Sequence, residues 1–250
     1  MRHYVTYGLL LALRGLSRLL YRVELSWLGA PPADRWENHR LVVFLHHTSL
    51  YEPVFLAGTP ISFIRRIAFH GVLPAAEKTI RRPIVGWFFK MIAAHVISIS
   101  RARDNTWFQV LSKIDPESMV ILTPEGRMMR RNGLDSSGRP MTVRGGIADV
   151  LEAIGEGRML IGYSGGLHHV QAPGEKFPHL FQTVRMNLEL VDIADYVRTI
   201  LQGRTPDEFR RAVCEDLERR REANCPIDGP KPWPTNGSTA SGPSGSSIEG

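Results

Sequence analysis

Two adjacent histidines and a glutamate stand where an apolar run of the sequence ends. Residues 41–45 are apolar, His47 is the second of the two histidines that follow, and Glu52 comes five residues later. A carboxylate on one ring nitrogen of an imidazole fixes its tautomer and raises its basicity, so the other nitrogen can deprotonate an alcohol. A short helix that begins at about Ser49, with Ser49 as its N-cap, would fold Glu52 back onto His47. The spacing therefore predicts a general base, His47, with Glu52 as its partner.

Two other interpretations of these residues exist. A histidine after a strand is often a polar residue that caps a loop and has no role in catalysis. The same residue types could instead hold a metal ion, and the candidate ligands are His46, His47, Glu52, His70, His95, His168 and His169. No tight ligand spacing such as H-E-x-x-H occurs, so a zinc site would have to gather its ligands from several loops.

A second loop with charged residues follows another apolar run, in the sequence ILTPEGRMMRR. Glu125, Gly126 and Arg127 come directly after the run, and further arginines stand at positions 130, 131, 139 and 144. Guanidinium groups donate paired hydrogen bonds to phosphate and carboxylate groups, so this composition predicts a loop that binds an anion. The alternative is a basic loop that is simply solvated.

The sequence also contains a G-x-S-x-G pattern, in which Ser164 occupies the position of a hydrolase nucleophile. That arrangement requires a helix immediately after the serine, followed by an acid and then a histidine further downstream. Here the chain continues as LHHVQAPGEKFP, and the later histidines are too close to Ser164. We therefore interpret this match as accidental.

In order and spacing, residues 40–165 resemble the lysophospholipid (glycerolipid) acyltransferase family, of which 1-acylglycerol-3-phosphate acyltransferases are members. The family motif N-H-x-S-x-x-D corresponds to HHTSLYE, with Glu52 in place of aspartate, and the motif E-G-T-R corresponds to PEGRMMR, without the threonine. A further family motif, G-x-x-F-I-D-R, survives in HVISISR only as Ile99 and Arg101. The family's fourth motif, with prolines after a strand, is replaced by IGYSGGLHH.

This resemblance implies that an acyl group moves from acyl-CoA or an acyl-carrier protein, as co-substrate and without another cofactor, to the hydroxyl of a lysophospholipid. It makes His47 and Glu52 the catalytic residues. The residues that it implies in substrate binding are Ser49, Arg101, Glu125, Gly126 and Arg127. The apolar stretch 83–96 would line a groove for the acyl chain, unless it is an ordinary core helix. The alternative functions are a peripheral lipid-binding protein without catalysis and a histidine-rich, metal-dependent hydrolase.

These residues must be positioned by an α/β domain. Strand-like runs occur at residues 40–45, 62–69, 96–100, 119–123, 159–163 and 184–191. Helix-like stretches occur near residues 83–94, 105–114, 143–154 and 206–222. This alternation predicts a mostly parallel central sheet flanked by helices, and the loops at the carboxyl ends of parallel strands should converge on one edge.

The 250-residue chain has 31 Lys and Arg against 25 Asp and Glu, and its net charge of +6 favours anionic partners. We expect a membrane lipid and the acyl donor as partners, and no nucleic acid, because no nucleic-acid-binding motif occurs. The chain has two cysteines without C-x-x-C spacing, so neither a disulfide framework nor a cysteine zinc site is indicated.

The amino-terminal residues predict a helix that lies in a membrane surface. Leucines at positions 9, 13, 16 and 20 share one face, and arginines at positions 14, 18 and 22 lie opposite, where they would meet anionic headgroups. The alternative is a surface helix docked on its own domain. We expect this segment at 1–28, an acyltransferase-like domain at 29–225 and a disordered, Pro-, Gly- and Ser-rich tail at 226–250. The expected location is the cytoplasmic face of a membrane.

Overall fold

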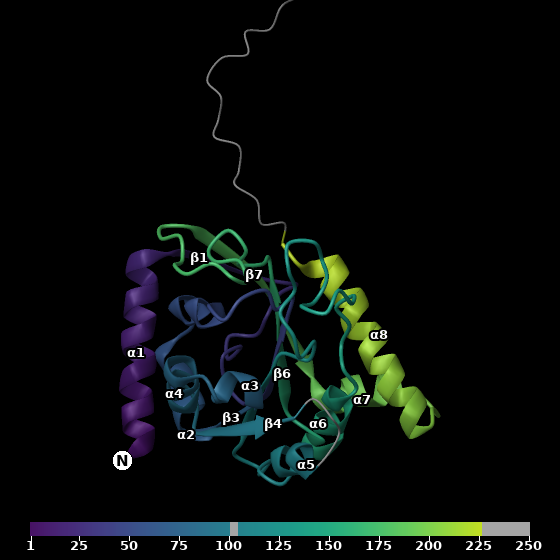
Figure 1. Ribbon diagram of the computed structural model, residues 1–250. Coiled ribbons are helices and arrows are strands. Elements are labelled where there is room, and N and C mark those ends of the chain that lie inside the picture. Colours follow the sequence, from purple (N-terminus) through teal and green to yellow (C-terminus); the bar gives the residue numbers. More distant parts are fainter. Residues whose placement is uncertain (101–104, 227–250) are drawn as a thin grey trace, which may run out of the picture.

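The computed structural model describes residues 1–100 and 105–226, which form a seven-stranded sheet between two layers of helices (Figure 1). The strands are β1 (Arg22–Trp27), β2 (His39–Leu45), β3 (Gly71–Ala76), β4 (His95–Ile99), β5 (Met119–Leu122), β6 (Arg158–Ser164) and β7 (Thr183–Asp192). The helices are α1 (Arg2–Leu20), the 3-10 helix η1 (Glu52–Gly58), α2 (Ile61–His70), α3 (Glu77–Ile80), α4 (Pro83–Met91), α5 (Asn105–Leu111), α6 (Gly146–Ile154), α7 (Ile193–Leu201) and α8 (Pro206–Asn224).

The strand order is β1-β7-β6-β2-β5-β3-β4. The five strands from β6 to β4 run parallel to one another, β7 is antiparallel to β6, and β1 is parallel to β7. This confirms the expected α/β class with a mostly parallel sheet. The carboxyl ends of β2, β5 and β6 lie at one edge, so the loops that follow them are neighbours.

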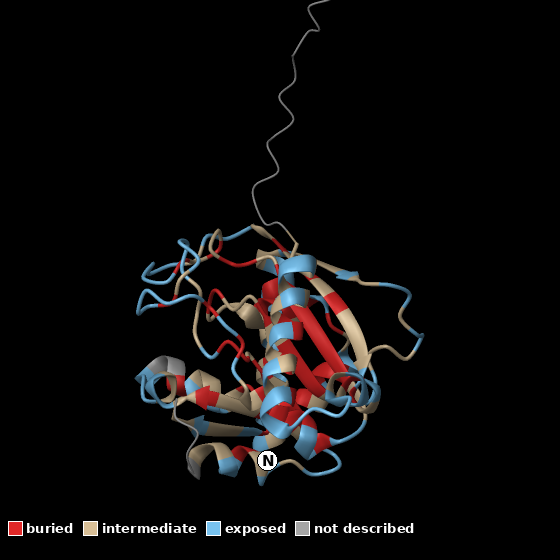
Figure 2. Ribbon diagram, turned by 90° about the vertical axis from the view of Figure 1, so that its right-hand side faces the viewer, coloured by how far each residue is buried: buried red, intermediate tan, exposed pale blue. Residues whose placement is uncertain are grey.

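The central strands are buried on both faces, which explains why they read as continuous apolar runs. On β2, Leu41, Val43 and Leu45 pack toward the cluster that contains residues of α6, α7 and α8. Val42 belongs to a second cluster, with residues of α1, η1 and α2. In Figure 2, buried strands stand behind a helix layer whose outer surface is exposed.

One predicted strand is wrong. Residues 62–69 form most of helix α2, and its buried side chains, Phe63, Ile64, Ile67 and Ala68, recur at helical spacing. The run is rich in β-branched and aromatic residues, which favoured a strand, but one apolar face packed on the sheet stabilises a helix instead. The strand of this region is β3, the next six residues.

The amino-terminal helix is shorter than the segment predicted at 1–28. Helix α1 ends at Leu20, and β1 adds an edge strand to the sheet beside β7. Part of the segment 1–28 therefore belongs to the same sheet as the rest of the chain. The predicted tail at 226–250 lies, apart from Pro226, outside the described residues.

The arginines of α1 are bonded to the protein, which the sequence did not predict. Arg14 is half-buried and Arg18 is exposed, and their Nε atoms donate to the backbone carbonyls of Thr59 (3.1 Å) and Ala57 (2.7 Å). The third predicted arginine, Arg22, lies in β1 and pairs with Glu24. The exposed residues of α1 that carry no charge are Tyr4, Val5, Gly8, Ala12, Gly15, Leu16 and Leu19. In the described part of the chain, no helix combines the length and the apolar character needed to cross a bilayer.

Candidate active site

His47 and Glu52 meet at the carboxyl end of β2. His47 Nδ1 lies 2.9 Å from Glu52 Oε1, at ion-pair distance although not aligned for a straight hydrogen bond. Both side chains are largely buried. His47 Nε2 makes no hydrogen bond to any described residue, and both residues line the same cavity. The geometry leaves one ring nitrogen available to a substrate hydroxyl.

The electrostatic surroundings make His47 a stronger base than a free histidine. Burial alone would lower its pKa, but the negative charge of Glu52, the contact with Glu52 and the charge of Glu125 outweigh burial and raise the pKa above 6.5. The larger of the two negative charges' effects on this pKa comes from Glu52, the residue that the sequence pairs with His47.

The turn between His47 and Glu52 differs from the predicted helix start. The 3-10 helix η1 begins at Glu52 itself, with Tyr51 in the N-cap position, so Ser49 is not its N-cap. The Oε1 atom of Glu52 accepts the backbone N–H groups of Thr48 (3.2 Å) and Ser49 (3.0 Å), which fixes the carboxylate beside the imidazole. The Ser49 hydroxyl is buried and accepts the N–H of Tyr51 (3.3 Å). Ser49 therefore shapes the turn, and its contact with substrate stays a prediction.

Glu125, which was expected to contact substrate, lines the cavity, and its carboxylate is bonded to other residues of the protein. The side chain is buried, and Oε1 and Oε2 accept the backbone N–H groups of His46 (3.1 Å) and His47 (2.7 Å). Arg221 of α8 donates to Oε1 at 2.8 Å. Glu125 is thus a partner of the histidine loop.

Arg127, the arginine of this loop that was expected to bind substrate, is also paired within the protein. Arg127 forms an ion pair with the buried carboxylate of Asp135 and lies near the hydroxyl of Ser137. Gly126 turns the chain with φ of 66°, in the region that favours glycine, and its N–H donates to the Thr123 carbonyl at 2.9 Å. The remaining expected residue, Arg101, lies outside the described residues.

Two other arginines, Arg139 and Arg144, line the cavity as Arg127 does. Neither of these two makes an ion pair with a described residue. The Arg144 N–H donates to the Pro124 carbonyl at 2.9 Å, which joins this segment to the Glu125 loop. The spacing of residues in the sequence could not distinguish these arginines from Arg127. What distinguishes them is the ion pair with Asp135, which Arg127 forms and these two arginines do not form.

The cavity that joins these residues has a volume of about 670 Å³. Its polar end contains the paired His47 and Glu52 and the loop after β5. Its apolar part extends beneath α1 and α2 and is lined by residues that include Leu10, Phe63, Leu160, Met186 and Leu188. From the stretch predicted to line an acyl groove, 83–96, Phe89 and Ile92 contact this cavity.

The loop after β6 closes the same edge of the sheet, as the parallel topology predicted. His46 Nδ1 lies 2.8 Å from the Ser164 carbonyl oxygen, and Thr48 Oγ1 accepts the N–H of Leu167 at 2.7 Å. His168 contacts the carbonyl of Met129 at 2.8 Å. These contacts place the second histidine loop against the first.

Two alternative interpretations of the sequence can be compared with this geometry. Ser164 is buried at the end of β6, and a loop follows it in place of the helix that a nucleophile elbow requires. The described residues contain no group of three or more His, Cys, Asp or Glu side chains that could hold a metal ion. His70 and His95 lie where β3 and β4 begin, at the sheet edge opposite His47.

Comparison with known proteins identifies a shared fold. No protein-family model matches this sequence, and no curated protein matches it. Among solved structures, the chain is similar to the 1-acyl-sn-glycerophosphate (LPA) acyltransferase PlsC from Thermotoga maritima, with a TM-score of 0.52 and 17% sequence identity. The similarity covers 89% of this chain and 83% of that chain. The chain therefore has the α/β fold of a solved LPA acyltransferase, the fold that the resemblance of its two motifs implied.

Proposed function

We propose that this protein transfers an acyl group from a thioester, acyl-CoA or acyl-carrier protein, to the hydroxyl of a lysophospholipid such as 1-acylglycerol-3-phosphate. The observation that supports this proposal most strongly is the His47–Glu52 pair in the wall of a cavity that is lined mostly by apolar side chains. A proton acceptor beside an apolar cavity suits a reaction that joins an acyl chain to an alcohol.

In the proposed reaction, Nε2 of His47 takes the proton of the acceptor hydroxyl while the hydroxyl oxygen attacks the thioester carbonyl carbon. The C–S bond breaks, the ester forms, and the departing thiolate receives the proton from the imidazolium of His47. Glu52 holds the ring and stabilises its charged form. The backbone N–H groups of Arg127 and Met128 are candidate donors to the developing oxyanion, because both residues line the cavity and neither N–H has an acceptor among the described residues.

We assign the anionic headgroup of the acceptor to Arg139 and Arg144. Both lie on the polar wall of the cavity, and their charges are not neutralised by a described carboxylate. Guanidinium groups bind phosphate through paired, charge-assisted hydrogen bonds. The acyl chain occupies the apolar part of the cavity, beneath α1 and α2.

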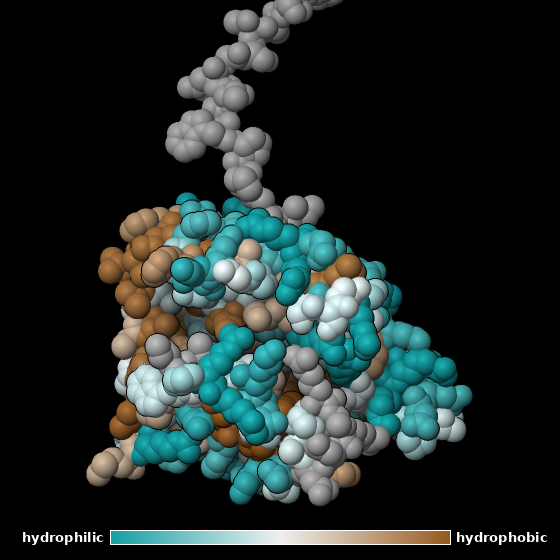
Figure 3. Space-filling model, viewed as in Figure 1, coloured by the Kyte–Doolittle hydropathy of each residue, from teal (hydrophilic) through white to brown (hydrophobic). Residues whose placement is uncertain are grey.

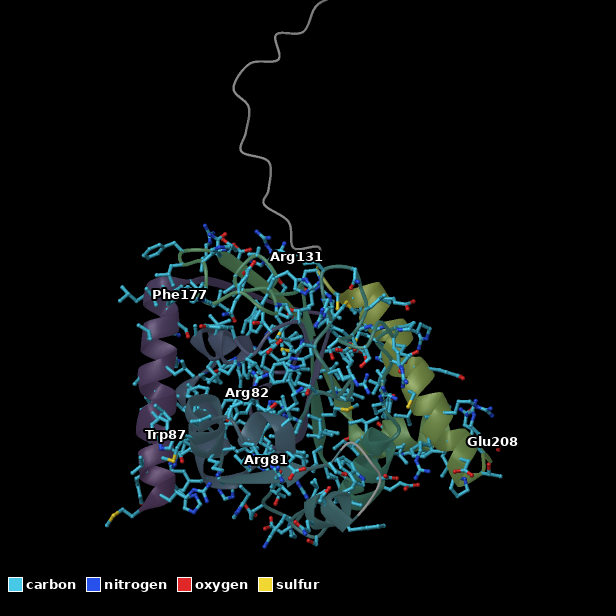
Figure 4. All side chains as sticks on the ribbon, viewed as in Figure 1. Arg81, Arg82, Trp87, Arg131, Phe177 and Glu208 are labelled. Carbon is cyan, nitrogen blue, oxygen red and sulfur yellow. The ribbon has the colours of Figure 1, made fainter. Side chains whose placement is uncertain are left out.

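We also propose that the protein binds a membrane surface through an outer apolar surface, defined by Tyr4, Val5, Leu16 and Leu19 of α1 with Phe177 and Phe181. Their exposed fractions range from 52% for Leu16 to 80% for Phe177. The two parts adjoin, because the N–H of Phe181 donates to the carbonyl of Leu20 at the end of α1. Figure 3 shows apolar residues gathered along the α1 side of the molecule, and Figure 4 places Phe177 and Trp87 on that side. A soluble globular surface seldom exposes such a contiguous apolar patch.

The test is a transfer assay with purified protein, labelled acyl-CoA or acyl-carrier protein and a panel of lysolipids, followed by analysis of the lipid products. A diacyl product and a free thiol in equal amounts are the expected result. Binding of the lipids without release of thiol from either donor would contradict the proposal and favour a lipid-binding protein.

A further inference from the structure

The far end of α8 is bonded to the histidine loop through a buried carboxylate. Arg221 Nη1 donates to Glu125 Oε1 at 2.8 Å, and the side chains of the two residues are 12% and 0% exposed. The two oxygens of Glu125 accept the successive backbone N–H groups of His46 and His47. His46 adopts φ of 65°, which residues other than glycine seldom adopt, so its backbone needs support from its surroundings.

The same part of α8 also holds the segment that contains the two unpaired arginines of the cavity. Arg221 Nη1 donates to the Met141 carbonyl at 3.2 Å. One turn earlier in the helix, Glu218 Oε1 accepts the N–H of Val143 at 2.7 Å. Residues 141 and 143 lie between Arg139 and Arg144, so α8 touches both the proton-acceptor loop and the cationic segment.

We propose that Arg221 is a positioning residue, which sets the histidine loop against the cationic segment of the cavity by bonding Glu125 and Met141 at once. It does not contact the reacting atoms. Its effect reaches His47 through the hydrogen bonds that the Glu125 carboxylate accepts from the backbone of the histidine loop. It reaches Arg139 and Arg144 through the backbone at Met141. The kinetic part of this inference rests on the proposed acyl transfer, whereas the structural part does not.

Loss of Arg221 would leave the Glu125 carboxylate buried without its cation. A buried charge that loses its partner is strongly unfavourable, so the carboxylate would move toward water. This movement weakens the two N–H bonds that fix residues 46 and 47. Misplacement of a catalytic group by about 1 Å can reduce a rate by roughly 100-fold.

The experiment compares Arg221→Met with a matched control, Arg220→Met, in the full-length protein. Arg220 is the adjacent residue, is also partly buried, and pairs with Glu189 at 2.6 Å, but its partners do not contact the histidine loop. Amide hydrogen exchange at residues 46, 47 and 143 reports on the positioning directly, without requiring activity. Values of kcat and KM for acyl transfer report on its consequence.

We expect Arg221→Met to accelerate exchange at these three amides and to lower kcat by roughly 100-fold, with a smaller change in KM for the acyl donor. Arg220→Met should lower thermal stability but leave exchange at these amides and kcat near wild type. Arg221→Lys keeps the charge and should recover part of the loss. If Arg221→Met does not fold, Arg221→Lys and Glu125→Gln are compared with wild type by the same two measurements.

Exchange at residues 46 and 47 that is no faster in the Arg221 variants than in Arg220→Met would overturn the proposal, as would equal losses of kcat in both. A wild-type protein that transfers no acyl group would instead contradict the proposed function. In that case, the exchange measurement still decides whether Arg221 positions the loop.

Discussion

The ring of His47 and the carboxylate of Glu52 are held together within a single turn of chain, with Nδ1 and Oε1 2.9 Å apart. The same oxygen accepts two backbone N–H groups of that turn, so the carboxylate is fixed before any substrate arrives. This arrangement is local in sequence, and it leaves the other ring nitrogen of a cavity-lining residue without a hydrogen bond to a described residue.

His47→Ala should reduce acyl transfer by roughly 100- to 10,000-fold, the range that a general base contributes. The fold should persist, which circular dichroism and thermal unfolding can check. His179→Ala is the matched control, because His179 is exposed and its side chain makes one hydrogen bond among the described residues, with the carbonyl of His169. Near wild-type transfer by purified His47→Ala protein would refute the assigned base.

The pH dependence of transfer should report the raised pKa of His47. The base must be neutral, so kcat/KM is expected to rise with pH through an acid limb that lies above pH 6.5. Glu52→Gln keeps an oxygen for the N–H groups of Thr48 and Ser49 but removes the charge, so its acid limb should move to lower pH. An acid limb that stays in place in Glu52→Gln would argue against coupling between the two residues.

Glu52→Asp provides a second comparison, because it restores the residue usual in the acyltransferase motif. The side chain becomes one methylene shorter, so it should not reach both the imidazole and the N–H groups of the turn. We expect its rate to lie between those of wild type and Glu52→Gln, measured at a pH above the acid limb. A rate equal to wild type would mean that the turn adapts to either length.

Arg139→Gln and Arg144→Gln should each raise KM for an acceptor that bears a phosphate. Hydrogen bonds to charged groups contribute about 1.5–3 kcal/mol, so the expected increase is roughly 10- to 100-fold. An acceptor without a phosphate, such as a monoacylglycerol, should show little change. Arg130→Gln is the control, because Arg130 is exposed and does not line the cavity. Equal increases in KM for both acceptors would mean that Arg139 and Arg144 do not bind the phosphate.

Replacement of Leu16 and Leu19 by Asp should weaken binding to vesicles. Both side chains are exposed on α1, so the substitutions should not disturb the core. A buried Leu contributes about 1.5–3 kcal/mol, and each loss should lower partitioning by roughly 10-fold or more. Leu201→Asp, an exposed apolar residue of α7, is the control. Co-sedimentation of the double variant at the wild-type level would rule out this face of α1.

A buried histidine should make the protein sensitive to acid. Burial, followed by the charges of Arg158 and Arg66, lowers the pKa of His39 to about 4. Between about pH 4 and pH 6.5, the unfolded chain therefore binds a proton that the folded chain does not, and the free energy of unfolding falls as pH falls. The full effect is about 3 kcal/mol. His39→Leu should flatten this dependence in denaturant unfolding measured from pH 7 to pH 4, and an unchanged slope would contradict the assignment.

The sequence by itself determined the α/β class, most of the strands and the His47–Glu52 pair. These features depend on periodicity and on residues five positions apart, so short-range physics is enough to predict them. It could not determine whether residues 62–69 form a strand or a helix, because their composition favours one and their burial in the tertiary structure favours the other.

Only the tertiary structure decided which charged groups remain available to a ligand. Glu125 and Arg127 come from a motif that suggests substrate binding, yet Glu125 is bonded to backbone 78 and 79 residues away and to an arginine 96 residues away. Arg127 is neutralised by Asp135, and the arginines of α1 donate to carbonyls of the protein. The physical reason is that a buried charge must find a partner, and partners distant in sequence become neighbours only when the sheet assembles.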